Sequence, residues 1–366
     1  MKRFQYILLA IGVLLIAGWL FMDDKIKQDI VSEALQPNSE SIQTGSETIV
    51  PEVVAEDLTV PWEIAFLPDD DMLVTERDGK LKRLGKSPTE FTISGVHAIG
   101  ESGLLGLALH PNFKQNNFVY LYFTTNNGTN KIVRYLLQDN QLSEDRTIIE
   151  NIPGANNHDG GRIAFGPDKL LYITTGDAQE TSHAQDTNSL AGKILRLKDD
   201  GSVPSDNPFS NAIYSYGHRN PQGLAWDDQG RLWATEHGRS GTSTGFDELN
   251  LIERGQNYGW PTIQGDEAQS GMETPIANSG AKTTWAPAGL AIAGNTIYFA
   301  GLRGQALYQT NISGSSVSEV TANFFSQYGR LRAVTIHDGY LYFSTSNRDG
   351  RGRPMVGDDK IFRLKL

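Results

Sequence analysis

The sequence predicts an all-β fold, a six-bladed β-propeller that follows an N-terminal signal or anchor segment and a polar linker. Two observations carry this prediction. A strand–turn–strand pattern occurs six times, and its copies start roughly 45 to 65 residues apart, near the spacing of propeller blades. The strands are short and no helical periodicity separates them, which indicates an all-β domain. The chain also has 38 glycines, which suit the many turns that such a fold requires.

Each copy has a short apolar strand, a turn rich in Pro, Asp or Gly, and an apolar-aromatic strand that ends in Thr, Ser or Ala. The copies span residues 62–75, 105–124, 162–174, 223–235, 289–300 and 333–344. Some add a third strand of the form Ile-x-Arg, as in Ile132-Val133-Arg134, Ile194-Leu195-Arg196 and Ile361-Phe362-Arg363. Six sheets arranged radially would bury both faces of each sheet. A β-sandwich is the alternative, but it does not explain a six-fold repeat.

The last copy runs to the final residue of the printed sequence, Leu366. We therefore expect residues 49–59 to supply the remaining strand of that blade and to close the ring. This gives a predicted propeller domain over residues 49–366. A chain of 366 residues is long enough for one large all-β domain.

The N-terminus predicts export. Lys2 and Arg3 precede an apolar run over residues 7–21, and Asp23 and Asp24 follow it. We interpret residues 1–22 as a signal peptide or membrane anchor, with a buried core helix as the alternative. Residues 23–48 are polar and form a predicted flexible linker. Because the basic residues stay in the cytoplasm, the domain is expected to be periplasmic or otherwise extracytoplasmic, secreted or anchored, with membrane contact only through this segment.

Composition excludes several functions. The net charge of −11 argues against nucleic-acid binding, which needs clustered Lys and Arg. The chain has no cysteine, so disulfides, thiolate metal sites and cysteine nucleophiles are excluded.

Three polar stretches stand just before the first strand of a repeat. His158, in Asn-Asn-His-Asp-Gly-Gly-Arg, is a candidate general base because imidazole titrates near neutrality. Arg219, one repeat later, offers donors suited to a carboxylate or a quinone oxygen. Arg330 and Arg332 alternate in an extended chain and so share a face. Their charges would repel unless an anion lay between them, which suggests an anionic ligand. A polar turn, an ion-paired arginine and solvated surface charge are the respective alternatives.

Further residues complete the candidate site. Trp285 precedes the fifth repeat and could stack on a planar ring, or else belong to the core. Arg303 follows the second strand of the same repeat. The stretches 236–239, 247–250 and 257–261 combine carboxylates with Gly-rich loops, a mixture that suits Ca²⁺. They lack the EF-hand spacing, so the calcium signal is weak by itself.

Together these stretches resemble the soluble aldose (glucose/sorbosone) dehydrogenases that use pyrroloquinoline quinone (PQQ). The similarity runs from about residue 52 to residue 366. Its motifs, in chain order, lie at residues 100–106, 156–162, 217–223, 236–238, 247–252, 257–261 and 330–332. So many ordered matches are more specific than any one of them. The family's fold is a six-bladed propeller, in agreement with the repeat count.

The resemblance implies an activity. Such an enzyme oxidises an aldose at its anomeric carbon to the lactone, and an external acceptor, a quinone, cytochrome or dye, then takes the electrons. His158 would take the proton of the anomeric hydroxyl. Arg219 would stabilise negative charge on the quinone oxygen. Other positions would contact PQQ, namely Asn220, Trp285, Arg303, Arg330 and Arg332.

The resemblance also implies two Ca²⁺ sites. The carbonyls of Gly238 and Arg239 would hold the catalytic ion, which polarises the quinone. Glu248 and the carbonyl of Tyr258 would hold a structural one.

Four positions depart from the pattern of well-known members. Asn157 replaces an Asp and Glu101 replaces a Gln. The resemblance places both positions beside the sugar, so it does not identify which sugar is the substrate. Arg303 stands where Lys is frequent, and Arg239 replaces a Pro of which only the carbonyl is needed. Two other functions remain as alternatives, a Ca²⁺-dependent lactonase or related hydrolase and a propeller that only binds a protein or glycan.

Overall fold

The computed structural model describes residues 50–239 and 245–366. The predicted signal or anchor segment (1–22) and linker (23–48) lie outside the described residues. Within the described residues, no helix has both the length and the apolar character needed to cross a membrane.

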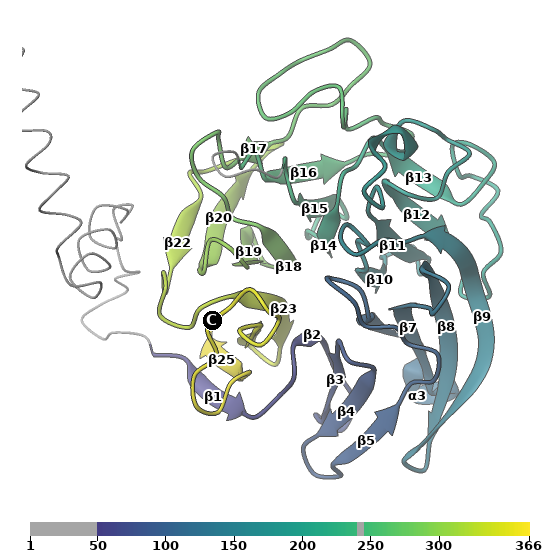
Figure 1. The fold of residues 1–366 in the computed structure, drawn as a ribbon, viewed down its shortest axis with the longest axis vertical. Helices are drawn as coiled ribbons and strands as arrows, with labels where there is room; N and C mark the ends of the chain where they lie inside the picture. Colours follow the sequence, from purple (N-terminus) through teal and green to yellow (C-terminus); the bar gives the residue numbers. More distant parts are fainter. Residues whose placement is uncertain (1–49, 240–244) are drawn as a thin grey trace, which may run out of the picture. The chain divides into compact units, whose positions relative to one another are not determined.

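The described chain forms six antiparallel sheets arranged around a central axis (Figure 1). The six-bladed propeller that the repeat predicted is therefore confirmed. The first three sheets contain β2 (Pro61–Phe66), β3 (Met72–Glu76), β4 (Lys80–Leu84) and β5 (Thr89–Thr92), then β6 (Leu104–Leu109), β7 (Phe118–Thr124), β8 (Thr129–Gln138) and β9 (Gln141–Pro153), then β10 (Ile163–Phe165), β11 (Leu171–Thr175), β12 (Lys193–Leu197) and β13 (Ile213–Tyr216).

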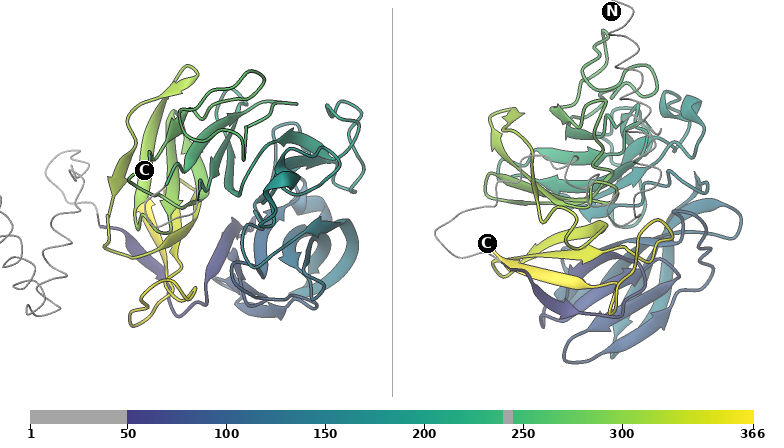
Figure 2. Two further views of the ribbon diagram at one scale, coloured as in Figure 1. Left: turned by 45° about the horizontal axis from the view of Figure 1, so that its top comes forward. Right: turned by 60° about the vertical axis from the view of Figure 1, so that its left-hand side comes forward.

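The remaining sheets follow the same order from the axis outward, and Figure 2 shows them from two further sides. Within residues 50–239 and 245–366, two short helices lie in loops, α3 (Phe113–Asn116) and the 3₁₀ helix η1 (Thr181–Ala184). The sheets contain β14 (Pro221–Trp226), β15 (Leu232–Glu236), β16 (Glu248–Ile252) and β17 (Ala277–Asn278), then β18 (Pro287–Ala293), β19 (Thr296–Gly301), β20 (Leu307–Ser313), β21 (Ser316–Val317) and β22 (Thr321–Asn323), then β23 (Leu331–His337), β24 (Tyr340–Thr345), β25 (Ile361–Lys365) and β1 (Glu52–Ala55).

The ring closes as the sequence predicted. Strand β1 pairs antiparallel with β25, with Glu52 opposite Arg363 and Val53 opposite Phe362. In Figure 1 the purple first strand lies beside the yellow last strand. Chain segments from the two ends of the domain thus share one blade, so this sheet is complete only when both ends of the domain are in place.

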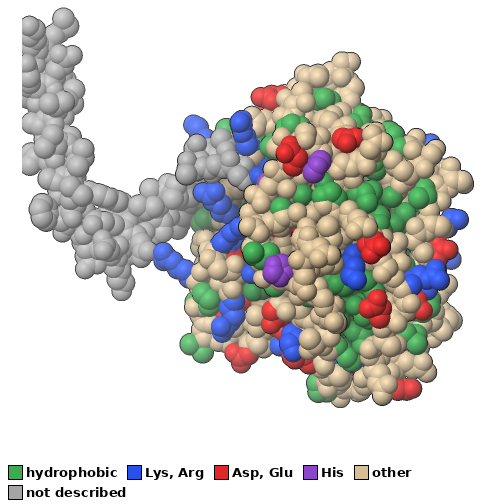
Figure 3. All heavy atoms as spheres, turned by 45° about the vertical axis from the view of Figure 1, so that its right-hand side comes forward, with side chains coloured by type: hydrophobic (Ala, Val, Ile, Leu, Met, Phe, Trp, Pro, Cys, Tyr) green, Lys and Arg blue, Asp and Glu red, His purple; other side chains and the backbone are tan. Residues whose placement is uncertain are grey.

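Turn chemistry and packing explain the local structure. Asp338 and Gly339 join β23 and β24, and both have positive φ, 46° and 75°. Asp-Gly suits such a two-residue hairpin turn. Large side chains such as Trp62, Trp233 and Phe299 are fully buried. Charged side chains of both signs are interspersed over the face drawn in Figure 3.

The order of strands within a blade positions the site. In all six blades the innermost strand (β2, β6, β10, β14, β18 or β23) comes first in the chain, before its antiparallel partner. The innermost strands therefore all begin at the same end of the channel, and the loops that precede them meet there. This convergence allows residues far apart in the sequence to form one site.

Candidate active site

His158 and Arg219 lie in contact at this end of the channel. His158 stands shortly before β10, and Arg219 stands shortly before β14 in the next blade. An Nη2 hydrogen of Arg219 is donated to Nε2 of His158 across 2.9 Å. A guanidinium can only donate, so Nε2 of His158 is the acceptor.

Asp177 fixes the other side of the imidazole. It follows β11, and its Oδ1 lies 2.7 Å from Nδ1 of His158. Nδ1 therefore carries the proton and donates a hydrogen bond to the carboxylate. This tautomer leaves a lone pair on Nε2. The indole of Trp260 donates to Oδ2 of Asp177 at 2.9 Å. Burial alone would raise the pKa of Asp177, but these hydrogen bonds and the backbone N–H of Gln179 lower it.

The backbone at His158 is constrained. Its φ is 66°, in the left-handed region that non-glycine residues seldom adopt. A Cβ atom on Gly176 would lie 1.9 Å from the carbonyl oxygen of His158, so only glycine fits there. Unusual backbone conformations of this kind often occur at functional sites.

Arg219 is held by its surroundings. Its backbone N–H donates to Glu236, whose other oxygen accepts from Nδ1 of His218 at 2.8 Å. Its guanidinium lies over the ring of Trp260, 5.3 Å from the centroid. Burial lowers the pKa of Arg219, although several carboxylates, Asp177 first among them, oppose that effect.

Asn220 is fully buried beside this pair. Its Oδ1 accepts from the backbone N–H of Gly160 at 2.9 Å. Among the described residues, its Nδ2 has no hydrogen-bond partner. A buried donor without a partner costs free energy, so this atom is suited to contact a ligand.

Arg330 and Arg332 are buried, with 7% and 4% of their surface exposed. Asp349 lies between them. Its Oδ2 is 2.8 Å from Nε of Arg330 and 3.7 Å from Nη2 of Arg332. Arg77 joins the cluster by donating to the carbonyl of Asp349 at 3.4 Å. Burial lowers the pKa of Arg332 to about 10, helped by the charges of Arg77 and Arg330 and opposed by Asp349.

The two substrate candidates share one partner. Arg351 donates from Nη1 to Glu101, and from Nη2 to Oδ1 of Asn157 at 2.6 Å. The other oxygen of Glu101 accepts from the backbone N–H of His158 at 3.3 Å. Glu101 and Asn157 therefore do lie beside the candidate base.

Trp285 and Arg303 differ from the other candidates. Trp285 is 7% exposed and packs in the core against Phe299 and Tyr308, with ring centroids 5.3 and 5.8 Å away. Arg303 is exposed, in the turn after β19. Their contact with a cofactor stays a prediction.

The calcium candidates fall into two places. Gly238 donates its N–H to Oδ1 of Asp247 at 2.9 Å, and Arg239 is the exposed residue that follows. Oδ2 of Asp247 accepts from the backbone N–H groups of residues 285 and 286, so it holds these loops together. The ring of Tyr258 is buried and stacks on His218.

Glu248 lies opposite Glu236 in the register of β15 and β16. Burial, and then the charge of Glu236, raises the pKa of Glu248 to about 8. Asn250 donates to Glu248 at 3.0 Å, and its buried Oδ1 has no partner among the described residues. In the part of the chain that the structure describes, no group of three or more His, Asp or Glu side chains is arranged to hold a metal. A cation here would therefore need carbonyl and amide oxygens as well.

Four residues of this site were missed by sequence reasoning, namely Asp177, Arg77, Asp349 and Arg351. Asp177 follows the second strand of its repeat after a single glycine, Gly176, and a carboxylate at that position is a signal that could have found it. Arg77 and Arg351 stand in ordinary polar turns, and nothing local distinguishes them. Trp260 lies within a stretch that the sequence analysis selected, but as part of a calcium loop.

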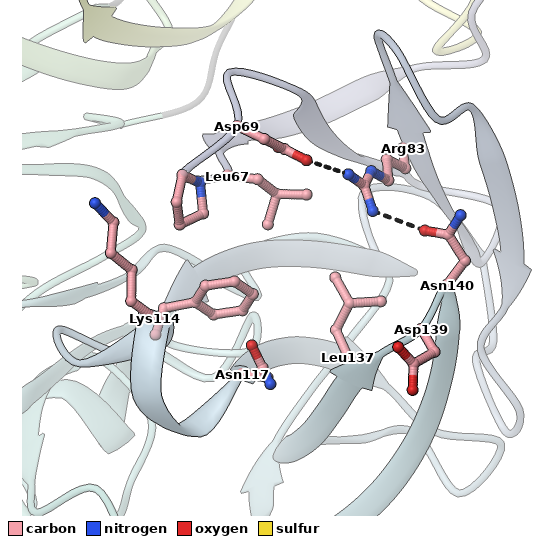
Figure 4. A pocket seen from close by; sticks show the side chains of 10 residues that line it. Leu67, Asp69, Arg83, Lys114, Asn117, Leu137, Asp139 and Asn140 are labelled. Carbon is pink, nitrogen blue, oxygen red and sulfur yellow. Dashed lines mark hydrogen bonds and ion pairs between the residues drawn. The ribbon is translucent and has the colours of Figure 1, made fainter.

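A separate pocket of about 350 Å³ lies between the first two blades (Figure 4). Arg83 spans it, bonded to Asp69 at 2.5 Å and to Asn140 at 2.7 Å. None of its lining residues belongs to the site around His158.

The chain is similar to known proteins over most of its length. The family model for glucose/sorbosone dehydrogenases matches residues 58–356. The aldose sugar dehydrogenase YliI of Escherichia coli is 32% identical, over 85% of this chain and 94% of its own. Quinoprotein glucose dehydrogenase B of Acinetobacter calcoaceticus is 35% identical, over 64% and 56%.

A solved structure agrees. The PQQ-bound aldose sugar dehydrogenase of Streptomyces coelicolor is 41% identical, with a TM-score of 0.80 over 87% of this chain and 97% of its own. The resemblance inferred from the motifs is thus confirmed, and the protein belongs to the glucose/sorbosone dehydrogenase family.

Proposed function

We propose that the protein is a PQQ-dependent dehydrogenase that oxidises an aldose at the anomeric carbon to the lactone. The observation that carries this proposal is the state of His158. Its Nε2 lone pair points at Arg219 while Asp177 holds the proton on Nδ1. A base oriented by a carboxylate, next to a buried cation, suits removal of a hydroxyl proton while negative charge develops nearby.

The residues fit PQQ, a planar molecule with three carboxylates. Three buried or half-buried arginines gather at Asp349: Arg330 and Arg332 at its carboxylate, and Arg77 at its backbone carbonyl. This surplus of positive charge is costly in a protein interior and suits an anionic ligand. The unpartnered Nδ2 of Asn220 supplies a further donor. PQQ, when bound, accepts the hydride that the sugar carbon gives up.

The protein's own groups handle the proton. Nε2 of His158 takes the proton of the anomeric hydroxyl, and Asp177 stabilises the resulting imidazolium. Arg219 donates to Nε2, so its guanidinium lies beside the atom that takes the proton. It can therefore stabilise a neighbouring oxygen that gains negative charge.

Calcium belongs to the same proposal. The half-buried carboxylate of Glu248 and the unpartnered, buried Oδ1 of Asn250 form an oxygen-rich group on one face of β16. These are the atoms that Ca²⁺ prefers. We assign the structural ion to Glu248 with the carbonyl of Tyr258, and the catalytic ion to the carbonyls of Gly238 and Arg239.

Electrons leave to an external acceptor, a quinone, cytochrome or dye. The basic and apolar start of the sequence supports an extracytoplasmic location, with residues 1–22 as signal or anchor. Fractionation of cells that express the full chain tests this, and recovery of the protein in the cytoplasm would contradict it.

Reconstitution tests the activity. The protein from residue 49 onward is mixed with PQQ and Ca²⁺, and dye reduction is followed with a panel of aldoses. Saturable PQQ binding with sugar-dependent dye reduction is expected. Failure to bind PQQ would overturn the proposal, and binding without turnover on any aldose would reject the substrate class.

A further inference from the structure

Arg351 joins parts of the propeller that are distant in the chain. It lies in the loop between β24 and β25 of the last blade. Its guanidinium reaches Glu101, which precedes β6, and Asn157, which precedes β10. One side chain thus links three blades at the end of the channel where His158 lies.

The link stands beside the candidate base and faces solvent. Oε1 of Glu101 accepts from Arg351, while Oε2 accepts from the backbone N–H of His158 at 3.3 Å. The side chain of Arg351 is 51% exposed, against 16% for Glu101. The two groups that Arg351 holds, Glu101 and Asn157, therefore lie next to the backbone of His158 and next to a solvent-exposed side chain.

The loop that carries Arg351 is itself fixed. The backbone N–H of Arg351 donates to Oδ1 of Asp349 at 2.9 Å, and Oδ2 of Asp349 accepts from Arg330. The position of Arg351 is therefore tied to the buried arginine cluster rather than to the exposed part of the loop.

We propose that Arg351 is a positioning residue that sets the substrate preference by holding Glu101 and Asn157 as hydroxyl-binding groups for a neutral aldose. This inference rests on the proposed function. The charge of Arg351 is matched by Glu101, so this pair offers a donor and an acceptor without a net charge of its own. Glutamate and amide oxygens held in a fixed geometry accept from ring hydroxyls, and their positions decide which hydroxyl configurations fit.

Four variants test the proposal: Arg351→Gln, Arg351→Lys, Glu101→Gln and the double variant Glu101→Gln/Arg351→Gln. The kcat and KM are measured for glucose, galactose, mannose and glucuronate. Arg351→Gln should raise KM for the preferred neutral aldose about tenfold, the size expected for loss of a charged hydrogen bond, with kcat changed less. The differences in KM among the epimers should become smaller in Arg351→Gln. Arg351→Lys should restore part of the preference.

The double variant separates positioning from general damage. Because Arg351 acts partly through Glu101 and partly through Asn157, adding Arg351→Gln to Glu101→Gln should raise KM by a smaller factor than Arg351→Gln does in the unmodified protein. Arg353→Gln is the matched control, because Arg353 is exposed two residues further along the same loop. It should leave KM and the epimer ranking unchanged.

Binding provides a readout that does not depend on turnover. Calorimetry with a 1-deoxy sugar, which lacks the anomeric hydroxyl, should show weaker binding to Arg351→Gln by the same factor as KM. PQQ affinity, followed by absorbance, is measured first. If the unmodified protein does not bind PQQ, or oxidises none of the aldoses, the proposed function is wrong. Normal activity with an unchanged epimer ranking in Arg351→Gln, or an equal loss in both backgrounds, would overturn the role of Arg351.

Discussion

Nε2 of His158 accepts a hydrogen bond of 2.9 Å from Nη2 of Arg219, although 61 positions separate the two residues. This contact fixes the tautomer of His158 and the position of the Arg219 guanidinium. It shows that the imidazole presents a lone pair, and it places a buried cation where charge would develop. The predictions below follow from this contact and from the groups that support it.

Replacement of His158 by Ala should lower kcat by about 10² or more, because the base is lost. PQQ binding should persist, since the arginine cluster is intact. Stopped-flow measurement of the half-reaction with sugar, beside a PQQ titration, checks both. His337→Gln is the control, because His337 ends β23 and so lies at the end of the channel away from the site. Unchanged turnover in His158→Ala would remove His158 from the role of base.

Asp177→Asn should lower kcat by about 10² to 10⁴ with little change in stability. The amide can donate to Nδ1 of His158, which moves the proton to Nε2 and removes the lone pair. A histidine NMR experiment that reports the tautomer should show Nε2 protonated in the variant. If the tautomer is unchanged and kcat still falls, Asp177 acts in another way.

Arg332→Met should stabilise the protein without PQQ, or leave its stability unchanged, while weakening PQQ binding at least tenfold. The reason is that a buried cation with too little compensation is costly, and an apolar side chain of similar length removes the cost. Denaturant unfolding and PQQ titration measure the two effects. Arg303→Met, at an exposed position, should affect PQQ affinity less. Normal PQQ affinity in Arg332→Met would contradict the assignment of the cluster.

Glu101→Gln should reduce the acid sensitivity of folding. Burial would raise the pKa of Glu101, but the charges of His237 and Arg351 and hydrogen bonds lower it to about 2. The folded-state pKa is thus below the unfolded value of 4.5, so the carboxylate stabilises the fold above pH 4.5 and loses this effect as pH falls through about 2.

The loss between pH 5 and pH 3 should amount to about 2 kcal/mol. Urea unfolding at both pH values should show this loss in the unmodified protein and a smaller one in Glu101→Gln. Glu319→Gln, at an exposed position, is the control. Equal acid sensitivity in Glu101→Gln and in the control would refute the prediction.

Chelation of Ca²⁺ should lower the Tm, and Glu248→Gln should lose most of this dependence on Ca²⁺. A ligand at 100 times its Kd stabilises by about 2.7 kcal/mol, which is easily seen in a thermal scan. Glu253→Gln, exposed just after β16, should keep the response. A full response in Glu248→Gln would place the ion elsewhere.

The sequence by itself determined the number of blades and predicted ring closure by residues 49–59, within which β1 lies. The blade number follows from six copies of a local strand–turn–strand pattern, and the closure follows because the last copy ends at Leu366. It also located His158, Arg219, Arg330 and Arg332, since each precedes or begins an innermost strand. The repeat alone placed these residues at one end of the channel.

The tertiary structure decided which residues contact one another. Asp177 is 19 positions from His158, Trp260 is 83 positions from Asp177, and Arg351 is 250 positions from Glu101. No sequence pattern connects such pairs. It also packed Trp285 against Phe299 and Tyr308, where the sequence left a cofactor contact and a core position open. The physical reason is that a propeller brings the loops of all six blades to one axis, so the site is assembled by ring closure rather than by any local segment.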